Sequence, residues 1–221
     1  MPPRKTFLPL LFLATLIATA GCEVVDAGDP GSTAAPTTGS TAGSGSSKDA
    51  VKQLDELKII AKAGSMSGYS REKFPHWKST GKNCDVRDSV LERDGSKIKL
   101  SGCNVVAGTF KSVYDDKTLT SPTQVDIDHM VPLANAWRSG ADKWTTEQRG
   151  AFANDLDRPQ LVAVSAGSNR SKGDQDPSTW KPPAKDEWCT YAQSWITVKS
   201  YYKLSVLQKE KDALKEMLET C

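Results

Sequence analysis

Residues 23–47 place the strongest limit on what this 221-residue chain can fold into. The stretch reads EVVDAGDPGSTAAPTTGSTAGSGSS and consists largely of Gly, Ser, Thr, Ala and Pro. Because such a segment buries too little apolar surface to offset the entropy lost on ordering, we expect a flexible tether there. The folded part is then confined to residues 49–221, a length typical of one domain.

The segment before the tether predicts export. Residues 1–21 begin with basic residues and continue with the apolar run FLPLLFLATLIATA, which is short for a membrane span and typical of a secretory signal. The ending TAGC resembles a bacterial lipobox, although Thr19 stands where Leu is more usual. We therefore expect residues 22–48 to be a lipidated Cys22 and its tether, on the outer side of a bacterial membrane. The alternative is an ordinary cleaved signal, which leaves Cys22 as a spare thiol on a secreted protein.

The charge balance argues against binding of nucleic acid through a basic surface that covers the whole domain. The chain has 29 basic and 27 acidic residues, a formal net charge of +2. A domain that binds nucleic acid through a globally basic surface carries a much larger excess. Any binding of nucleic acid must therefore depend on a local patch.

The remaining cysteines number four, an even count that indicates two disulfides in an exported domain. Of the three possible pairings we favour Cys84–Cys103 with Cys189–Cys221, because each bond closes a short local segment. A zinc site is the competing interpretation, but no two cysteines have Cys-x-x-Cys spacing.

The pattern of apolar and turn residues predicts an α+β fold that is mostly helical toward the C-terminus. TTEQRGAFANDL has the form of a helix capped by Thr145 or Thr146. TQVDI and PQLVAVS have the form of short strands, and AGSNRSKGD that of a turn running into a short helix. Further helices are expected at 50–63, 184–202 and 205–220, and further strands near 98–100 and 105–110.

The strand-like run VDIDH ends in polar residues that suggest a site. It carries Asp126, Asp128 and His129, and a turn follows at Pro132. The next strand leads to Asn169 at a helix start, so Asn169 is expected close to the acid and the histidine. A carboxylate and an amide oxygen are hard ligands that suit Mg²⁺ or Mn²⁺, while a neutral histidine can take a proton from water. Adjacent strand residues point to opposite faces, so one shared site requires the strand to end or twist near His129.

The segments DIDHMVPL and QLVAVSAGSNRSKGDQDPSTW together resemble the His-Asn-His (HNH) nucleases, specifically a secreted family with a DIDH motif related to DUF1524. The resemblance extends to FPHW, GTFKSVYDD, FANDL and the flanking cysteines. It implies a ββα-metal core with additional helices, stapled by disulfides, in residues 49–221. It further implies His129 as general base, with Asp128 and Asn169 as ligands of one divalent metal, and products with 5′-phosphate and 3′-hydroxyl ends.

The family's middle asparagine, which orients the base, has no direct match here. Arg158 or Gln160 occupies its usual place, so we assign the supporting role to the nearby Asn154.

Other polar residues have weaker assignments. Arg170 and Lys172 are candidates for binding substrate phosphate, with an exposed helix surface as the alternative. Asp126 is either a further ligand or support, or part of a structural salt bridge. His76, in KFPHW, is interpreted as a packing or capping residue.

These patterns predict a monomeric, metal-dependent endonuclease that hydrolyses phosphodiester bonds of DNA with low sequence specificity, with RNA as a further candidate substrate. The membrane is the second expected partner, through the lipid at Cys22. The competing hypothesis is a non-catalytic surface lipoprotein that binds a cell-envelope partner and holds a structural cation at the Asp-His pair.

Overall fold

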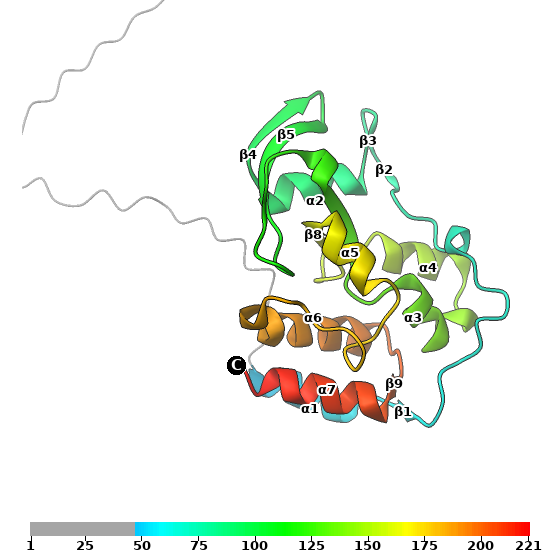
Figure 1. Ribbon diagram of the computed structural model, residues 1–221. Helices are drawn as coiled ribbons and strands as arrows, with labels where there is room; N and C mark the ends of the chain where they lie inside the picture. Colours follow the sequence, from blue (N-terminus) through cyan, green and yellow to red (C-terminus); the bar gives the residue numbers. More distant parts are fainter. Residues whose placement is uncertain (1–46) are drawn as a thin grey trace, which may run out of the picture. The chain divides into compact units, whose positions relative to one another are not determined.

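The computed structural model describes residues 47–221, which form an α+β fold, as the sequence predicts (Figure 1). The expected signal peptide, the lipidated Cys22 and the tether as far as residue 46 lie outside the described residues. The α-helices are α1 (Ser47–Glu56), α2 (Val86–Asp94), α3 (Leu133–Arg138), α4 (Thr146–Ala153), α5 (Ala166–Lys172), α6 (Trp188–Tyr201) and α7 (Gln208–Leu218). None of these helices is long and apolar enough to cross a membrane.

The strands are short and form small separate sheets. They are β1 (Ile59–Ile60), β2 (Ser79–Gly81), β3 (Cys84–Asp85), β4 (Gly95–Ser101), β5 (Asn104–Lys111), β6 (Thr118–Leu119), β7 (Val125–His129), β8 (Leu161–Ser165) and β9 (Val206–Leu207). Strands β4, β5 and β6 form an antiparallel sheet, β2 pairs with β3, and β1 pairs in parallel with β9. Single turns of 3-10 helix occur at η1 (Arg71–Lys73), η2 (Pro122–Gln124), η3 (Ala141–Lys143) and η4 (Lys185–Glu187).

A two-stranded sheet and one helix form the centre of the described fold. Strands β7 and β8 pair antiparallel over their whole length, with Ile127 opposite Ala163. Helix α5 begins directly after β8 and lies across this pair (Figure 1). Ser165 caps α5 by accepting a hydrogen bond from the backbone N–H of Ser168. The result is a ββα unit with α5 on one face.

Two clusters of buried side chains hold this unit in place. Val125 and Ile127 on β7 pack with side chains of α2, β5 and β8. The larger cluster lies among the helices and includes Trp195 and Leu214, from α6 and α7. Because alternate residues of β7 enter the first cluster, the residues between them are free to face α5.

Both disulfides have the pairing favoured from the sequence. Cys84 is bonded to Cys103, which ties the start of α2 to the turn between β4 and β5. Cys189 is bonded to Cys221, which ties the start of α6 to the end of the chain.

The helices predicted at 50–63 and 205–220 are both shorter in the structure. The first ends early and the second begins late, and the two missing segments pair with each other. Helix α1 ends at Glu56 because Ile59 and Ile60 pair as β1 with β9, which also takes Val206 and Leu207 out of the last helix. The helix expected at 184–202 begins at Trp188, after a 3-10 turn. Helix α4 has the predicted cap, since Thr145 accepts a hydrogen bond from the N–H of Gln148 in a capping box.

Candidate active site

Strand β7 presents its acidic residues to α5. Asn169 Nδ2 donates to Asp126 Oδ2 at 3.0 Å, and Lys172 Nζ donates to Asp128 Oδ2 at 2.6 Å. Both acids therefore lie on the α5 face of the strand, as alternation along a strand requires. The structure brings Asn169 next to Asp126, whereas the sequence led us to expect it beside Asp128.

Asp128 is part of a buried ion pair. Its side chain is almost wholly buried, and Lys172 has 0% exposure. Oδ2 accepts from both Lys172 Nζ and the hydroxyl of Tyr114, each at 2.6 Å, and the same ammonium donates to the backbone oxygen of His129 at 2.9 Å. Burial raises the pKa of Asp128 and lowers that of Lys172, while the attraction between the two charges opposes both shifts.

The burial of Lys172 corrects one sequence-based assignment. An ammonium fully enclosed by protein and bonded to Asp128 and to a backbone oxygen is not available to a substrate phosphate. Arg170, the other phosphate candidate, is exposed on α5 and does not line the cavity described below.

His129 is enclosed and held in one tautomer. Its side chain is 4% exposed and packs against the rings of Trp77 and His76, with centroids 5.8 and 6.3 Å away. Nε2 lies 3.0 Å from the backbone oxygen of Ala153. Because a carbonyl only accepts, Nε2 must carry the hydrogen, which leaves the lone pair of a neutral imidazole on Nδ1.

The environment of His129 keeps the ring neutral. Burial lowers its pKa to about 3, and the charge of Arg71 acts in the same direction, against the opposing effect of the Ala153 carbonyl. At neutral pH the imidazole is therefore an uncharged acceptor at Nδ1.

Asn154 supports His129 indirectly. It makes no contact with the imidazole; its Nδ2 donates to the backbone oxygens of Pro75 and Gly150, each at 2.7 Å, and its Oδ1 accepts from the N–H of Lys78 at 2.9 Å. These bonds fix the end of α4, where the preceding Ala153 presents its carbonyl to His129. The carbonyl of Ala153 thus orients the ring.

The two residues at the usual place of the middle asparagine have other partners. Gln160 is fully buried and bonds to both the N–H and the carbonyl of Val131 through its side-chain amide, which fixes the turn after β7. Arg158 pairs with Asp155 and lies over the ring of Tyr201.

One cavity brings the main candidates together. It has a volume of about 220 Å³, and Asp128, His129 and Asn169 all line it. Its other lining residues are Tyr69, Arg71, Ile127, Pro132, Leu133, Ala134, Gly173 and Asp174. A proton acceptor and two oxygen-bearing side chains therefore share one cavity, although Asp128 and His129 are adjacent on β7. We call it the site cavity.

The sequence reasoning missed Arg71 and Tyr69. Both precede β7 by a long stretch of chain, and η1 brings Arg71 to the site cavity. The only available signal was local, a basic residue in SREKFPHW beside the aromatic run that packs around His129.

The donor atoms at the site cavity suit a hard divalent cation with few protein ligands. Among residues 47–221, no group of three His, Cys, Asp or Glu side chains is placed to hold a metal. Asp128 uses the same oxygen, Oδ2, for Tyr114 and Lys172, so Oδ1 is the oxygen it can offer to a cation. Because Asn169 uses Nδ2 to donate to Asp126, its Oδ1 is the atom that the amide can offer to a cation. A carboxylate and an amide oxygen, completed by water and phosphate, fit Mg²⁺ or Mn²⁺.

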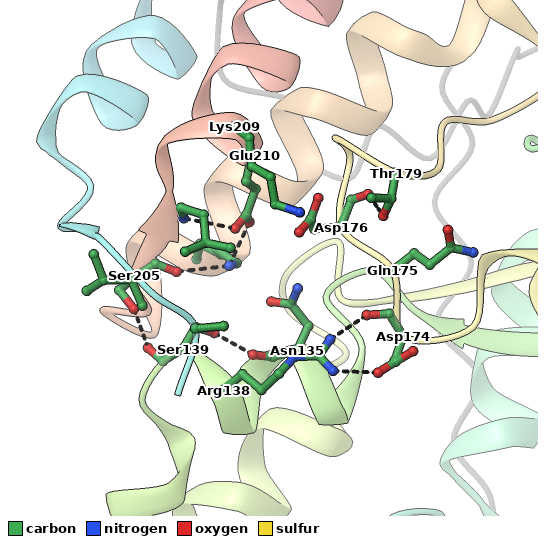
Figure 2. Close-up of a pocket in the computed structure, with 14 residues that line it drawn as sticks. Asn135, Arg138, Ser139, Asp174, Gln175, Asp176, Thr179, Ser205, Lys209 and Glu210 are labelled. Carbon is green, nitrogen blue, oxygen red and sulfur yellow. Dashed lines mark hydrogen bonds and ion pairs between the residues drawn. The ribbon is translucent and has the colours of Figure 1, made fainter. Parts of the chain in front are cut away.

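A second cavity of about 290 Å³ lies between α3 and the α6–α7 region (Figure 2). Its charged side chains are largely paired: Arg138 bonds to Asp174 at 2.6 Å, and Lys199 to Glu210 at 2.6 Å. No histidine lines it. Although it is the larger cavity, no neutral imidazole lines it, so the site cavity is the candidate active site.

Comparison with known proteins identifies the relatives of this chain. Residues 85–217 match the family described as GmrSD restriction endonucleases, C-terminal domain. An uncharacterized secreted protein of Arthroderma benhamiae is 54% identical over 159 residues, which is 72% of this chain and 78% of that protein. No solved structure matches.

Proposed function

We propose, from the premise that this chain belongs to the family of the GmrSD restriction endonuclease C-terminal domain, that it is a metal-dependent endonuclease. Its reaction is hydrolysis of phosphodiester bonds in DNA, with RNA as a further substrate class. The matched segment contains Asp126, Asp128, His129, Asn154 and Asn169, so the family relationship covers every residue of the proposed chemistry.

The observation that carries the proposal is the state of His129. The ring is neutral because burial lowers its pKa to about 3, and the Ala153 carbonyl keeps the hydrogen on Nε2. The lone pair on Nδ1 can then take a proton from a water molecule that attacks phosphorus. A protonated imidazole would lack this acceptor, and a freely rotating one would not hold it in a fixed direction.

Asp128 and Asn169 are the proposed metal ligands, and Asp126 supports Asn169 through its hydrogen bond at 3.0 Å. When bound, a divalent cation supplies neutralisation of the charge that develops on the phosphate and its leaving oxygen. Lys172 and Tyr114 fix the Asp128 carboxylate, so its remaining oxygen has a defined direction. Orientation of the base by Ala153 and of the ligand by Lys172 is thus achieved before substrate arrives.

The expected substrate range and location follow from the same features. Contacts to phosphate position a nucleic acid but do not read its bases, so a domain of this kind should cut with little sequence preference.

Two disulfides and a secreted relative support an extracellular protein. We further propose that the mature chain is a monomer held at a membrane through lipid on Cys22.

The test is incubation of the purified domain with supercoiled plasmid in the presence of Mg²⁺ or Mn²⁺. The expected result is nicking that EDTA abolishes and that Asp128→Ala or Asn169→Ala shifts to higher metal concentration. A plasmid that stays intact with every divalent metal tried would refute the nuclease proposal.

The competing hypothesis, a non-catalytic surface lipoprotein with a structural cation at the Asp-His pair, is weakened by one observation. Lys172 already neutralises Asp128, so burial of the carboxylate needs no cation there. The same plasmid assay separates the two, because this candidate predicts no cleavage.

A further inference from the structure

We propose that Arg71 binds a phosphate group of the substrate strand at the site cavity, a role that rests on the proposed function. The ligand class is a phosphodiester, held through its non-bridging oxygens. The residue lines the site cavity together with Asp128, His129 and Asn169, although it belongs to η1.

Within residues 47–221 the guanidinium of Arg71 has no hydrogen-bond or ion-pair partner, which sets it apart from most other arginines there. Hydrogen bonds to carboxylates or backbone oxygens occupy Arg87, Arg93, Arg138, Arg149 and Arg158. Within residues 47–221, only Arg71 and Arg170 make no side-chain hydrogen bond or ion pair, and of these two only Arg71 lines the site cavity. An unpaired arginine at a cavity is available to two oxygens of a phosphate group.

The charges that line the site cavity leave Arg71 as the uncompensated one. Asp128 is neutralised by Lys172 at 2.6 Å, and Asp174 is neutralised by Arg138 at 2.6 Å. The remaining lining residues, apart from Arg71, carry no formal charge at neutral pH. Among the lining residues Arg71 is therefore the charged group that lacks an opposite partner, and it offers a positive charge to phosphate.

The backbone that carries Arg71 is held firmly, although its side chain is exposed. The segment Arg71–Lys78, which we call the strap, begins with η1, and its Phe74 is completely buried. Arg149 Nε donates to the carbonyl of Lys73 at 2.9 Å, and Asn154 bonds to both Pro75 and Lys78. Helix α4 thus anchors the strap at three points, so little backbone ordering is needed when phosphate binds.

The same strap surrounds the proposed base. Its His76 and Trp77 pack against His129, and the charge of Arg71 is close enough to affect that imidazole electrostatically. A phosphate held by Arg71 would therefore lie in the cavity that His129 also lines. Because the guanidinium is a planar fork, it can donate two parallel hydrogen bonds to two oxygens of one phosphate, a fixed geometry that an ammonium does not provide.

The experiment measures binding without turnover. A short fluorescein-labelled DNA duplex is titrated with His129→Ala protein, with and without Arg71→Ala, by fluorescence anisotropy at several salt concentrations. We expect Arg71→Ala to weaken binding about tenfold at low salt and to reduce the slope of log affinity against log salt by about 1. Arg71→Lys should retain the slope but bind less tightly than the parent.

The matched control is Lys52→Ala, which removes one exposed positive charge from α1, a helix that packs against α6 and α7. It should leave affinity and slope within experimental error of the parent. Thermal unfolding should give the same Tm for Arg71→Ala and the parent, because the Arg71 side chain has no bond within the fold.

Two results overturn the proposal: an Arg71→Ala protein with unchanged affinity and slope, or a loss of binding that follows Arg170→Ala instead.

In cleavage assays, Arg71→Ala should raise KM for plasmid by a larger factor than it lowers kcat. If wild-type protein binds DNA through Arg71 but never cuts it, the nuclease function fails and the phosphate site stands. If wild-type protein does not bind DNA at all, both fail.

Discussion

The buried ion pair between Lys172 and Asp128 gives the sharpest stability prediction. Replacing Lys172 with Met keeps much of the side-chain volume but removes the ammonium that lies 2.6 Å from Asp128 Oδ2 and 2.9 Å from the His129 carbonyl. The carboxylate then remains buried with the Tyr114 hydroxyl as its remaining partner in the fold.

The magnitude follows from that geometry. Removing one member of a buried pair leaves an uncompensated charge, which costs about 3–5 kcal/mol of unfolding free energy. The double change Lys172→Met with Asp128→Asn removes both charges of this pair, so it should cost less than Lys172→Met alone, about 1–3 kcal/mol for the disrupted hydrogen bonds. The two changes are therefore strongly non-additive.

Urea unfolding of the four proteins at pH 7 measures this cycle. A coupling energy below about 0.5 kcal/mol, or a Lys172→Met protein as stable as wild type, would refute the buried pair. An exposed Lys172 that binds phosphate, as the sequence suggested, predicts that outcome, together with a loss of DNA affinity.

Three further predictions concern stability. Asn154→Ala removes three hydrogen bonds, two to the strap and one to Gly150 within α4, so it should cost about 2–4 kcal/mol in urea unfolding and lower kcat through the loosened Ala153 carbonyl. Full activity would contradict the supporting role. The pKa of His129 falls from 6.5 in the unfolded chain to about 3 in the fold, so between these pH values only the unfolded chain binds the proton. The unfolding free energy of wild type should therefore fall by about 2 kcal/mol from pH 8 to pH 5, and that of His129→Gln should lack this decrease. Equal pH dependence in the two proteins would be the contrary result. Replacing both Cys189 and Cys221 with Ser opens a loop with a sequence separation of 32 and should cost about 3–4 kcal/mol; an unchanged urea midpoint would count against the bond.

Local sequence patterns predicted the parts of the fold that depend on neighbouring residues. The β7 and β8 strands, the start of α5 and the Thr145 cap all follow from alternation or capping within a few residues. The disulfides followed from segment length, because each bond joins residues close in the chain. The helix ends near Glu56 and Gln208 were missed because a parallel pairing between distant segments sets them.

The site was predictable only in part. The sequence placed His129 and Asn169 near each other, and both line the site cavity. It gave no sign that Lys172 points inward, because exposure of a short helix depends on what packs against it. The hydrogen bond from His129 to the carbonyl of Ala153 could not be predicted, because every residue has a backbone carbonyl and the residue type does not show which one is used. Arg71 was missed for a similar reason: only the tertiary fold brings η1 to β7.

The single measurement that tests the central claim is the rate of plasmid nicking by wild type and by His129→Ala, at the same saturating Mg²⁺ concentration. Both proteins must first be shown to be folded by thermal unfolding. If Nδ1 of His129 accepts the proton of the attacking water, the variant should be slower by about 100-fold to 10,000-fold. Equal rates in two folded proteins would contradict the account.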